Sequence, residues 1–430
     1  MRKMKDSGIE WIGQIPEDWQ LSKIGAVYDE RNTNVSDKDY TPLSVTKQGV
    51  VPQLETAAKT DNGDNRKLIK KNDFVINSRS DRRGSCGISE LDGSCSLINT
   101  VLKPRNNMCN KYYNYIFHSD LFSDEFYRWG NGIVDDLWST KWSEMKRIYI
   151  PYPSLATQSR IADYLDEKCG EIDRYIEKQQ QIIEKLKAYK QTVITEAVTK
   201  GLDPTVPMKD SGIEWIGMIP AHWKVAKLAN LFSFIGGYAF NSDIYVPETN
   251  NQIIRIGNVK NNLLLFDSNP VYISDDFAKQ VERFRLQVDD ILFTMTGTKG
   301  KRDYFYTLII DSSHLQTKKL YLNQRVGCFR KKGEIFPAYY NYLLKDSRIL
   351  DSIFLYETGT ANQGNLGIET INRTKVHLPP YDEQVDIALY LSKKCDAIDK
   401  AIFEREDVIN NFTEYKKSFI YEAVTGKIEV

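Results

Sequence analysis

The stretch Met4-Lys-Asp-Ser-Gly-Ile-Glu-Trp-Ile-Gly13 occurs a second time, without a change, at residues 208–217. An Ile-Pro pair and then a Trp follow both copies: Ile15, Pro16 and Trp19 in the first, and Ile219, Pro220 and Trp223 in the second. Chance does not produce an identical stretch of this length, so an internal duplication organises the chain. The offset between the two copies is 204 residues.

A second repeat lies further along each half, at an offset of 226 residues. Its members are Gln158, Ile161, Ala162, Leu165, Cys169, Ile172 and Asp173 in the first half, and Gln384, Ile387, Ala388, Leu391, Cys395, Ile398 and Asp399 in the second. The region between the repeated parts has therefore gained 22 residues in the second half. Two similar frames, each a Trp-containing head and a long tail, enclose two dissimilar inserts at roughly 20–152 and 224–379.

The tails carry apolar residues at spacings that alternate between four and three, which is the pattern of a coiled-coil seam. The predicted apolar seam residues are Leu165, Ile172, Ile176, Ile183, Leu186, Val193, Leu391, Ile398, Ile402, Ile409, Phe412 and Phe419. Each seam is polar at the same two places, Gln179 and Lys190 in the first and Arg405 and Lys416 in the second. A two-fold relation between the halves would make the helices antiparallel and bring the C-terminus beside the N-terminus. The alternative is that each helix packs only on its own domain.

The predicted fold class is therefore α+β with a pseudo-two-fold internal repeat. Two mixed α/β domains are separated by two long antiparallel coiled-coil helices. The predicted boundaries are 1–152 for the first head and insert, 153–200 for the first helix, 201–379 for a linker with the second head and insert, and 380–430 for the second helix.

Composition limits the functions that the chain can have. The 430 residues hold 58 basic and 58 acidic side chains, so a case for nucleic-acid binding must rest on local charge. No signal peptide and no apolar run long enough to span a bilayer are visible, which predicts a cytoplasmic protein without a membrane contact. The six cysteines form no Cys-x-x-Cys pair and there are four histidines, so no metal site is predicted.

Local charge gathers in two loops. Asp73-Phe-Val-Ile-Asn77 and Asp290-Ile-Leu-Phe-Thr294 each predict an apolar strand, and each is followed by a polar, glycine-containing loop. The candidate DNA-binding residues are Ser78, Arg79, Arg82 and Arg83 in the first insert, and Thr294, Thr296, Thr298, Lys299, Lys301 and Arg302 in the second. Arginine can pair bidentately with guanine and lysine neutralises phosphate. The alternative is a solvated hairpin with ordinary surface charge.

No catalytic site is predicted. The run at 297–301 has the wrong spacing for a phosphate-binding loop. Leu378-Pro-Pro-Tyr381 is similar to the adenine-gripping motif of methyltransferases, but Leu378 has no side-chain acceptor for the base. The two prolines also have a structural reason, because they stand where a helix begins.

Together these features resemble the specificity (S) subunit of type I restriction–modification enzymes, over essentially the whole chain. The segments that carry the resemblance are Asp6 through Trp19 and its copy, 153–161, 379–387, 290–297 and 77–84. The resemblance implies that each insert is a target-recognition domain reading one half of a bipartite DNA sequence, with the helices as a spacer. It further implies that the chain does no chemistry and holds no cofactor.

The resemblance also implies partners besides double-stranded DNA. These are two methyltransferase subunits, which use S-adenosylmethionine, and restriction subunits that act as ATP-dependent translocase and endonuclease with Mg²⁺. Two other interpretations remain. A coiled-coil scaffold could bind proteins through its two variable inserts, and it would be indifferent to DNA sequence. A self-sufficient DNA-modifying enzyme would need a cofactor site of its own.

Overall fold

The computed structural model describes residues 2–54, 63–132, 138–360 and 362–430. The chain divides into two compact units. Unit 1 comprises Met1–Gln181 and Arg405–Val430, and unit 2 comprises Ile182–Glu404. Two long helices, α5 (Leu155–Lys200) and α11 (Tyr381–Val424), each contribute one part to unit 1 and the other part to unit 2.

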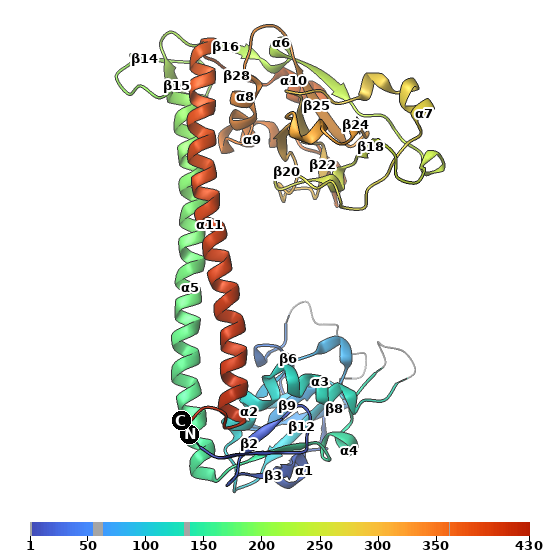
Figure 1. Cartoon of the computed structure of the whole chain (residues 1–430), viewed down its shortest axis with the longest axis vertical. Coiled ribbons are helices and arrows are strands. Elements are labelled where there is room, and N and C mark those ends of the chain that lie inside the picture. The colour runs from blue at the N-terminus through green and yellow to red at the C-terminus, as the bar shows by residue number, and fades with distance from the viewer. Residues whose placement is uncertain (1, 55–62, 133–137, 361) are drawn as a thin grey trace. The chain divides into compact units, whose positions relative to one another are not determined.

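Unit 1 is built around an antiparallel four-stranded sheet of order β10-β9-β12-β4 (Figure 1). Its strands are Cys86–Ile88, Phe74–Asn77, Asn99–Pro104 and Tyr28–Glu30. A second sheet joins β11 (Gly93–Cys95), β8 (Arg66–Ile69) and β5 (Asn34–Val35), and β6 (Leu43–Thr46) and β7 (Gly49–Pro52) form a hairpin. The remaining elements are β1 (Met4–Asp6), β2 (Gln14–Pro16), β3 (Gln20–Lys23), α1 (Ile24–Val27), η1 (Ser80–Arg82), α2 (Asn110–His118), α3 (Asp120–Arg128), α4 (Trp142–Met145) and β13 (Tyr149–Tyr152).

Unit 2 repeats this plan around a sheet of order β17-β25-β21-β23. Its strands are Phe232–Gly236, Val326–Lys331, Ile291–Thr294 and Thr307–Ile309. The frame elements are β14 (Met208–Asp210), β15 (Met218–Pro220), β16 (Lys224–Lys227), α6 (Leu228–Leu231), α8 (Pro337–Leu343), α9 (Ser347–Phe354), α10 (Ile368–Arg373) and β28 (Lys375–Leu378). Further elements are η3 (Ser242–Ile244), β18 (Asn251–Ile254), η4 (Ile256–Asn258), β19 (Val259–Lys260), β20 (Leu263–Leu264), α7 (Asp275–Gln280), η5 (Glu282–Phe284), β22 (Thr296–Gly297), η6 (Ser313–Leu315), β24 (Lys319–Leu322), β26 (Thr358–Thr360) and β27 (Gln363–Asn365).

The two predicted strands are confirmed as β9 and β21, and both are buried along their whole length. A buried aspartate precedes each one and is paired with an arginine, because a buried carboxylate needs a partner. Asp73 pairs with Arg31 at 2.6 Å, and Asp290 pairs with Arg330 at 2.7 Å. Arg31 follows β4, whereas Arg330 lies on β25, so the two inserts pair the buried aspartate with arginines from different places in the sheet.

The long helices run antiparallel within unit 1. The Tyr164 ring packs on Phe419 with centroids 5.8 Å apart, and the Tyr175 ring packs on Phe412 at 4.6 Å, so partners descend as α5 ascends. All twelve predicted apolar seam residues are buried or half-buried. The polar seam positions also find partners across the helix pair.

Each seam lysine binds an aspartate of the other helix. Lys416 Nζ lies 2.6 Å from Asp173 Oδ1 in unit 1, and Lys190 Nζ lies 2.6 Å from Asp399 Oδ2 in unit 2. The remaining polar position is filled in unit 1 by Gln179, whose Oε1 accepts a 3.5 Å hydrogen bond from Arg405. These pairs fix the register of the helices, since a slip would separate the charges.

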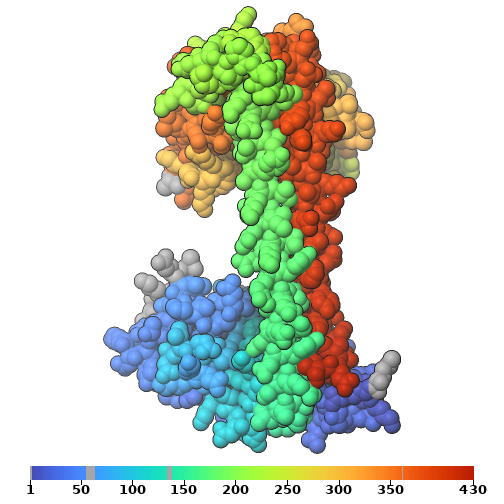
Figure 2. Space-filling model, turned by 90° about the vertical axis from the view of Figure 1, so that its left-hand side faces the viewer, coloured from blue at the N-terminus to red at the C-terminus, as the bar shows by residue number. Residues whose placement is uncertain are grey.

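The chain ends meet in unit 1, as the repeat predicts. The Tyr421 hydroxyl, near the end of α11, donates a 2.9 Å hydrogen bond to the carbonyl of Ile12 in the first head. The head lies against the red end of α11, and the two termini are neighbours (Figures 1 and 2). In unit 2 the corresponding helix end and head are joined by the chain itself, because α5 ends shortly before the second head begins.

His377 on β28 is a buried histidine without a hydrogen-bond partner in the described structure, and the indoles of Trp215 and Trp223 meet its ring edge-on. Burial lowers its pKa from 6.5 to about 4, and the nearby positive charge of Arg348 acts in the same direction, while Asp346 opposes it. Above pH 6.5 the ring is neutral in both the folded and the unfolded chain, so the free energy of unfolding is highest there as far as His377 is concerned.

We expect the free energy of unfolding to decrease as the pH falls from 6.5 towards 4, since in this range only the unfolded chain binds a proton at His377. The loss attributable to His377 is on the order of 3 kcal/mol. Replacing His377→Phe should flatten the decline in thermal-unfolding temperature over this range, as measured by calorimetry. Pro151 holds the equivalent place in β13, so unit 1 provides an internal comparison. An equally steep decline in the variant would contradict the assignment.

Candidate nucleic-acid interface

The loop that follows the buried strand is held by the same backbone pairing in both units. Thr140 N donates to Ser78 O at 2.9 Å in unit 1, and Leu366 N donates to Met295 O at 3.3 Å in unit 2. One residue later in each loop, Arg79 pairs with Ser139 and Thr296 pairs with Asn365 as antiparallel bridges.

A third segment completes each ladder. Asn131 pairs with Ser139 in unit 1, and Thr358 pairs with Asn365 in unit 2. The pairing consists of isolated bridges in unit 1 and of the three-stranded sheet β22-β27-β26 in unit 2, although the two inserts share little sequence. In each unit this paired backbone and its loop are the candidate site.

In the first loop, the predicted residues differ in their availability. Ser78 is buried, and its hydroxyl donates a 2.6 Å hydrogen bond to Ile98 O. Arg82 is exposed and lies 3.5 Å from the neighbouring carboxylate of Asp81. Ser78 therefore anchors the loop, while Arg79 and Arg82 carry its accessible charge.

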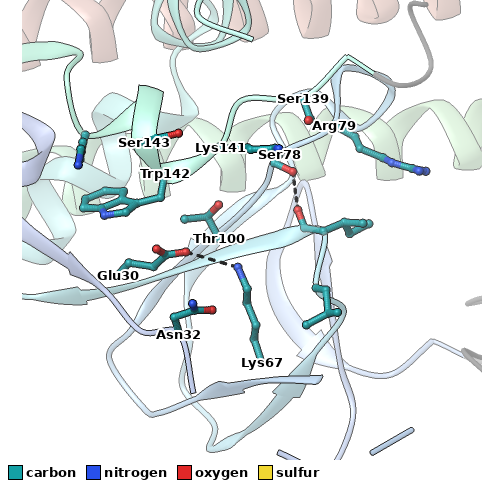
Figure 3. Close-up of a pocket in the computed structure, with 13 residues that line it drawn as sticks. Glu30, Asn32, Lys67, Ser78, Arg79, Thr100, Ser139, Lys141, Trp142 and Ser143 are labelled. Atoms are coloured by element: carbon teal, nitrogen blue, oxygen red, sulfur yellow. Dashed lines mark hydrogen bonds and ion pairs between the residues drawn. The ribbon is translucent and has the colours of Figure 1, made fainter. Parts of the chain in front are cut away.

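A cleft of about 650 Å³ lies beside Arg79 and is bordered by Lys67, Lys141 and Lys146 (Figure 3). Glu30 is the acidic residue on its wall, and its carboxylate lies 3.5 Å from Lys67 Nζ. Arg79 extends away from that pair. Among the described residues, no carboxylate lies within ion-pair distance of Arg79, Lys141 or Lys146. The cleft is consequently basic, in a chain whose net charge is zero.

Hydrogen bonds from Thr298, Lys299 and Gly300 hold the second loop in place. Thr298 N donates to Asp303 at 2.7 Å, and the side chain and then the N–H of Thr298 lower the pKa of that carboxyl. Lys299 Nζ donates to Gly359 O at 3.2 Å, and Gly300 N donates to Glu357 at 3.0 Å. Lys301 stays exposed without an ion-pair partner in the described parts of the chain.

Thr294 does not belong to the surface of this loop. Its side chain is 1% exposed, and its hydroxyl oxygen accepts a 3.0 Å hydrogen bond from Tyr306 N. A buried threonine at the end of β21 cannot reach a base edge. The prediction of a DNA contact at Thr294 is contradicted by this burial, and the residue instead terminates the strand.

Sequence reasoning missed the hairpin of β26 and β27. Its exposed polar residues are Thr358, Thr360, Asn362 and Gln363. They flank the second loop because β27 pairs with both β22 and β26. The available signal was the run Gly359-Thr360 and Asn362-Gln-Gly-Asn365, in which two glycines lie among hydrogen-bonding side chains.

Arg83 and Arg302 are both exposed and both bound to a carboxylate. Arg83 lies 2.9 Å from Asp124 on α3, and Arg302 pairs with Asp351 on α9. Of the aromatic residues in the later part of each insert, Tyr112, Tyr113, Phe126, Tyr127, Tyr339 and Tyr340 are buried in the core.

Neither a metal site nor a membrane span is found in the described residues. No group of three or more His, Cys, Asp or Glu side chains is placed there to hold a metal ion. No helix in those ranges is both long and apolar enough to cross a bilayer. All six cysteines are free, and five of them are buried.

Comparison with known proteins agrees with the geometry. Residues 220–410 match the family model of the type I restriction modification DNA specificity domain. The specificity subunit of the type I restriction enzyme MjaVIII from Methanocaldococcus jannaschii is 24% identical, over 97% of this chain and 94% of that protein. That of EcoKI from Escherichia coli K12 is 23% identical, over 97% and 90%. Residues 220–410 thus match a type I DNA specificity domain, and nearly the whole chain is similar to type I specificity subunits.

Solved structures share the fold of this chain. A chain from a study of complex assembly and conformational transition of the type I R-M system matches with a TM-score of 0.73. It is 13% identical, and the match covers 96% of this chain and 99% of the other. The HsdS subunit from Thermoanaerobacter tengcongensis matches with a TM-score of 0.51 and 14% identity, over 96% and 98%.

The second loop should depend on Glu357, which accepts hydrogen bonds from Gly300 N and, at 2.6 Å, from the Tyr304 hydroxyl. Replacing Glu357→Ala removes both acceptors. We expect amide hydrogen exchange at Gly300 to accelerate about fivefold, which corresponds to about 1 kcal/mol for a partly exposed hydrogen bond. Mass spectrometry of peptides covering 295–306 measures the change. Glu369→Ala on α10 is the control, because Glu369 is exposed and its ion pair is with Arg373 on the same helix. Equal exchange in both variants would contradict the role of Glu357.

Proposed function

We propose that this chain is the sequence-specific DNA-binding subunit of a type I restriction–modification complex, and that each unit reads one half of a bipartite target. The observation that carries the proposal is the duplicated site. The same backbone pairing supports a basic or polar loop in each of two dissimilar inserts, within a chain that is similar to type I specificity subunits. Duplication with divergence at the loop suits two domains that read different sequences.

In unit 1, the proposed chemistry is cationic. Arg79 and Arg82 supply donors for guanine edges, while Lys141 and Lys146 on the cleft wall neutralise phosphate. Phosphate contacts supply affinity that falls with salt, and base contacts supply selectivity of roughly 1–3 kcal/mol each.

In unit 2, the proposed chemistry is more polar. Thr296, Thr298 and the amides of Asn362 and Gln363 can bond base edges, since Asn and Gln match adenine bidentately. Lys299 and Lys301 provide the positive charge. The two units therefore differ in the kind of sequence that they select.

The helices α5 and α11 are proposed to set the spacing between the half-sites and to dock two methyltransferase subunits. S-adenosylmethionine, ATP and Mg²⁺ would then belong to the methyltransferase and restriction subunits, and this chain would be non-catalytic. Its place of action would be the cytoplasm, where it meets genomic DNA. This division of labour suits a chain in which no catalytic motif is recognised.

The experiment that tests the proposal is an adenine-methylation map of the host genome with and without this gene. Loss of a split motif with a fixed gap supports it, and exchanging residues 20–152 for another insert should then change one half of the motif. If no motif changes, the next measurement is whether the complex of this chain with its methyltransferase binds DNA in a sequence-specific way. Indifference of that complex to DNA sequence would favour a scaffold whose inserts bind proteins. Binding of S-adenosylmethionine by the chain alone would favour a self-sufficient enzyme.

Replacing Arg79→Ala should relax recognition in one half-site. Loss of a base-edge contact costs roughly 1–3 kcal/mol, which is about a tenfold to hundredfold loss of discrimination at one position. Competition binding with oligonucleotides altered in either half measures it. Gln363→Ala is the matched control, because Gln363 is an exposed base-reading candidate of unit 2, and it should relax recognition in the other half alone. Equal loss at both halves in the Arg79 variant would refute the assignment.

Lengthening both helices should lengthen the unread gap. Seven residues added after Gln181 and seven added after Glu404 keep the heptad seam and add about 10 Å. This length is about three base-pair rises of ~3.4 Å. We expect the methylated motif to gain about three unread base pairs, with both half-sites unchanged. An altered half-site with a constant gap would contradict the spacer role.

A further inference from the structure

In both units, one loop arginine is held by an acid and an aromatic ring of the same helix. Arg83 lies 2.9 Å from Asp124, and its guanidinium carbon lies 5.1 Å from the centroid of the Tyr127 ring. Arg302 pairs with Asp351, and its guanidinium carbon lies 5.7 Å from the centroid of the Phe354 ring. We call each of these three-residue groups a loop clamp.

The two clamps occupy equivalent places in the fold. Asp124 and Tyr127 are three residues apart on α3, and Asp351 and Phe354 are three residues apart on α9, so each pair shares one helix face. The helix residues of the second clamp both lie 227 positions beyond those of the first.

The arginines do not keep that offset. Arg83 stands six residues after the end of β9, whereas Arg302 stands eight residues after the end of β21. The second loop is thus two residues longer at this point, yet its arginine reaches the same helix positions. The contact between the loop arginine and the helix is therefore kept although the loop length differs.

The clamped guanidinium is occupied in two ways. Its N–H groups face a carboxylate and its plane faces a ring, which are the two interactions that arginine combines best. Arg83 pairs through Nη2 and Arg302 through Nη1, so turning either guanidinium towards a guanine edge would mean giving up its contacts with the helix. Arg79 and Lys301 differ, because the charged ends of their side chains have no ion-pair partner in the described structure.

We infer that Arg83 and Arg302 are positioning residues, which hold each recognition loop on its helix so that the neighbouring side chains meet DNA in one geometry. In unit 1 the residues presented in this way are Arg79 and Arg82, and in unit 2 they are Thr298, Lys299 and Lys301. The inference rests on the proposed function, and it replaces direct base reading as the role of Arg83 and Arg302.

Hydrogen exchange of the full chain without DNA separates the two roles. Arg83→Ala should accelerate exchange at Arg82 and Ser85, whose amides bond within the loop, by roughly threefold to tenfold. Arg82→Ala is the matched control and should leave Ser85 unchanged, since Arg82 is paired with Asp81 inside the loop. Unchanged exchange in the Arg83 variant would overturn the inference, because a residue that only contacts DNA does nothing in its absence.

A charge exchange gives a second readout on the complex with its methyltransferase. Arg83→Asp and Asp124→Arg should each weaken discrimination of the first half-site, and the double variant should restore it to within about threefold of the parent. If Arg83 instead reads DNA, Asp124→Arg keeps discrimination and the double variant stays as defective as Arg83→Asp. That result would overturn the clamp. Absence of sequence-specific binding by the parent complex would instead overturn the proposed function, and the exchange experiment on the free chain would still judge the clamp.

Discussion

Each unit contains the C-terminal end of a long helix that begins in the other unit. The Tyr112 hydroxyl donates a 2.7 Å hydrogen bond to Val424 O, and the Tyr339 hydroxyl donates a 2.9 Å bond to Val198 O. Both tyrosines are fully buried, so an unmatched hydroxyl would be costly. These two bonds dock the final turn of α11 on unit 1 and that of α5 on unit 2, and the heads, sheets and loops are arranged around them.

This docking explains how dissimilar inserts keep one site geometry. Gln158 accepts from Cys109 N and Gln384 accepts from Phe336 N, so the start of each long helix also holds the helix that carries the buried tyrosine. The recognition loops leave the same place in each sheet and are paired by the same ladder. The side chains of the loops can then differ between the units while the helices and the backbone pairing that hold the loops stay the same.

The repeat, the helices and the strands β9 and β21 were predictable, because each depends on local spacing or on identity within the chain. The burial of Thr294 was not, since it follows from Tyr306 folding back on the strand end. The partners of Arg83 and Arg302 were equally out of reach, because Asp124 and Asp351 lie more than forty residues away. The β26–β27 hairpin carries glycines and amides rather than charge, and a search for basic loops passes over it.

The division of the sequence between the units has a consequence for biosynthesis. Unit 2 is one continuous stretch, Ile182–Glu404, whereas unit 1 needs residues 405–430 to complete its core. A ribosome therefore releases everything that unit 2 requires before it supplies the last turn on which Tyr112 docks. The half that is translated first is completed last, and a chain cut short by premature termination leaves that half without its closing helix.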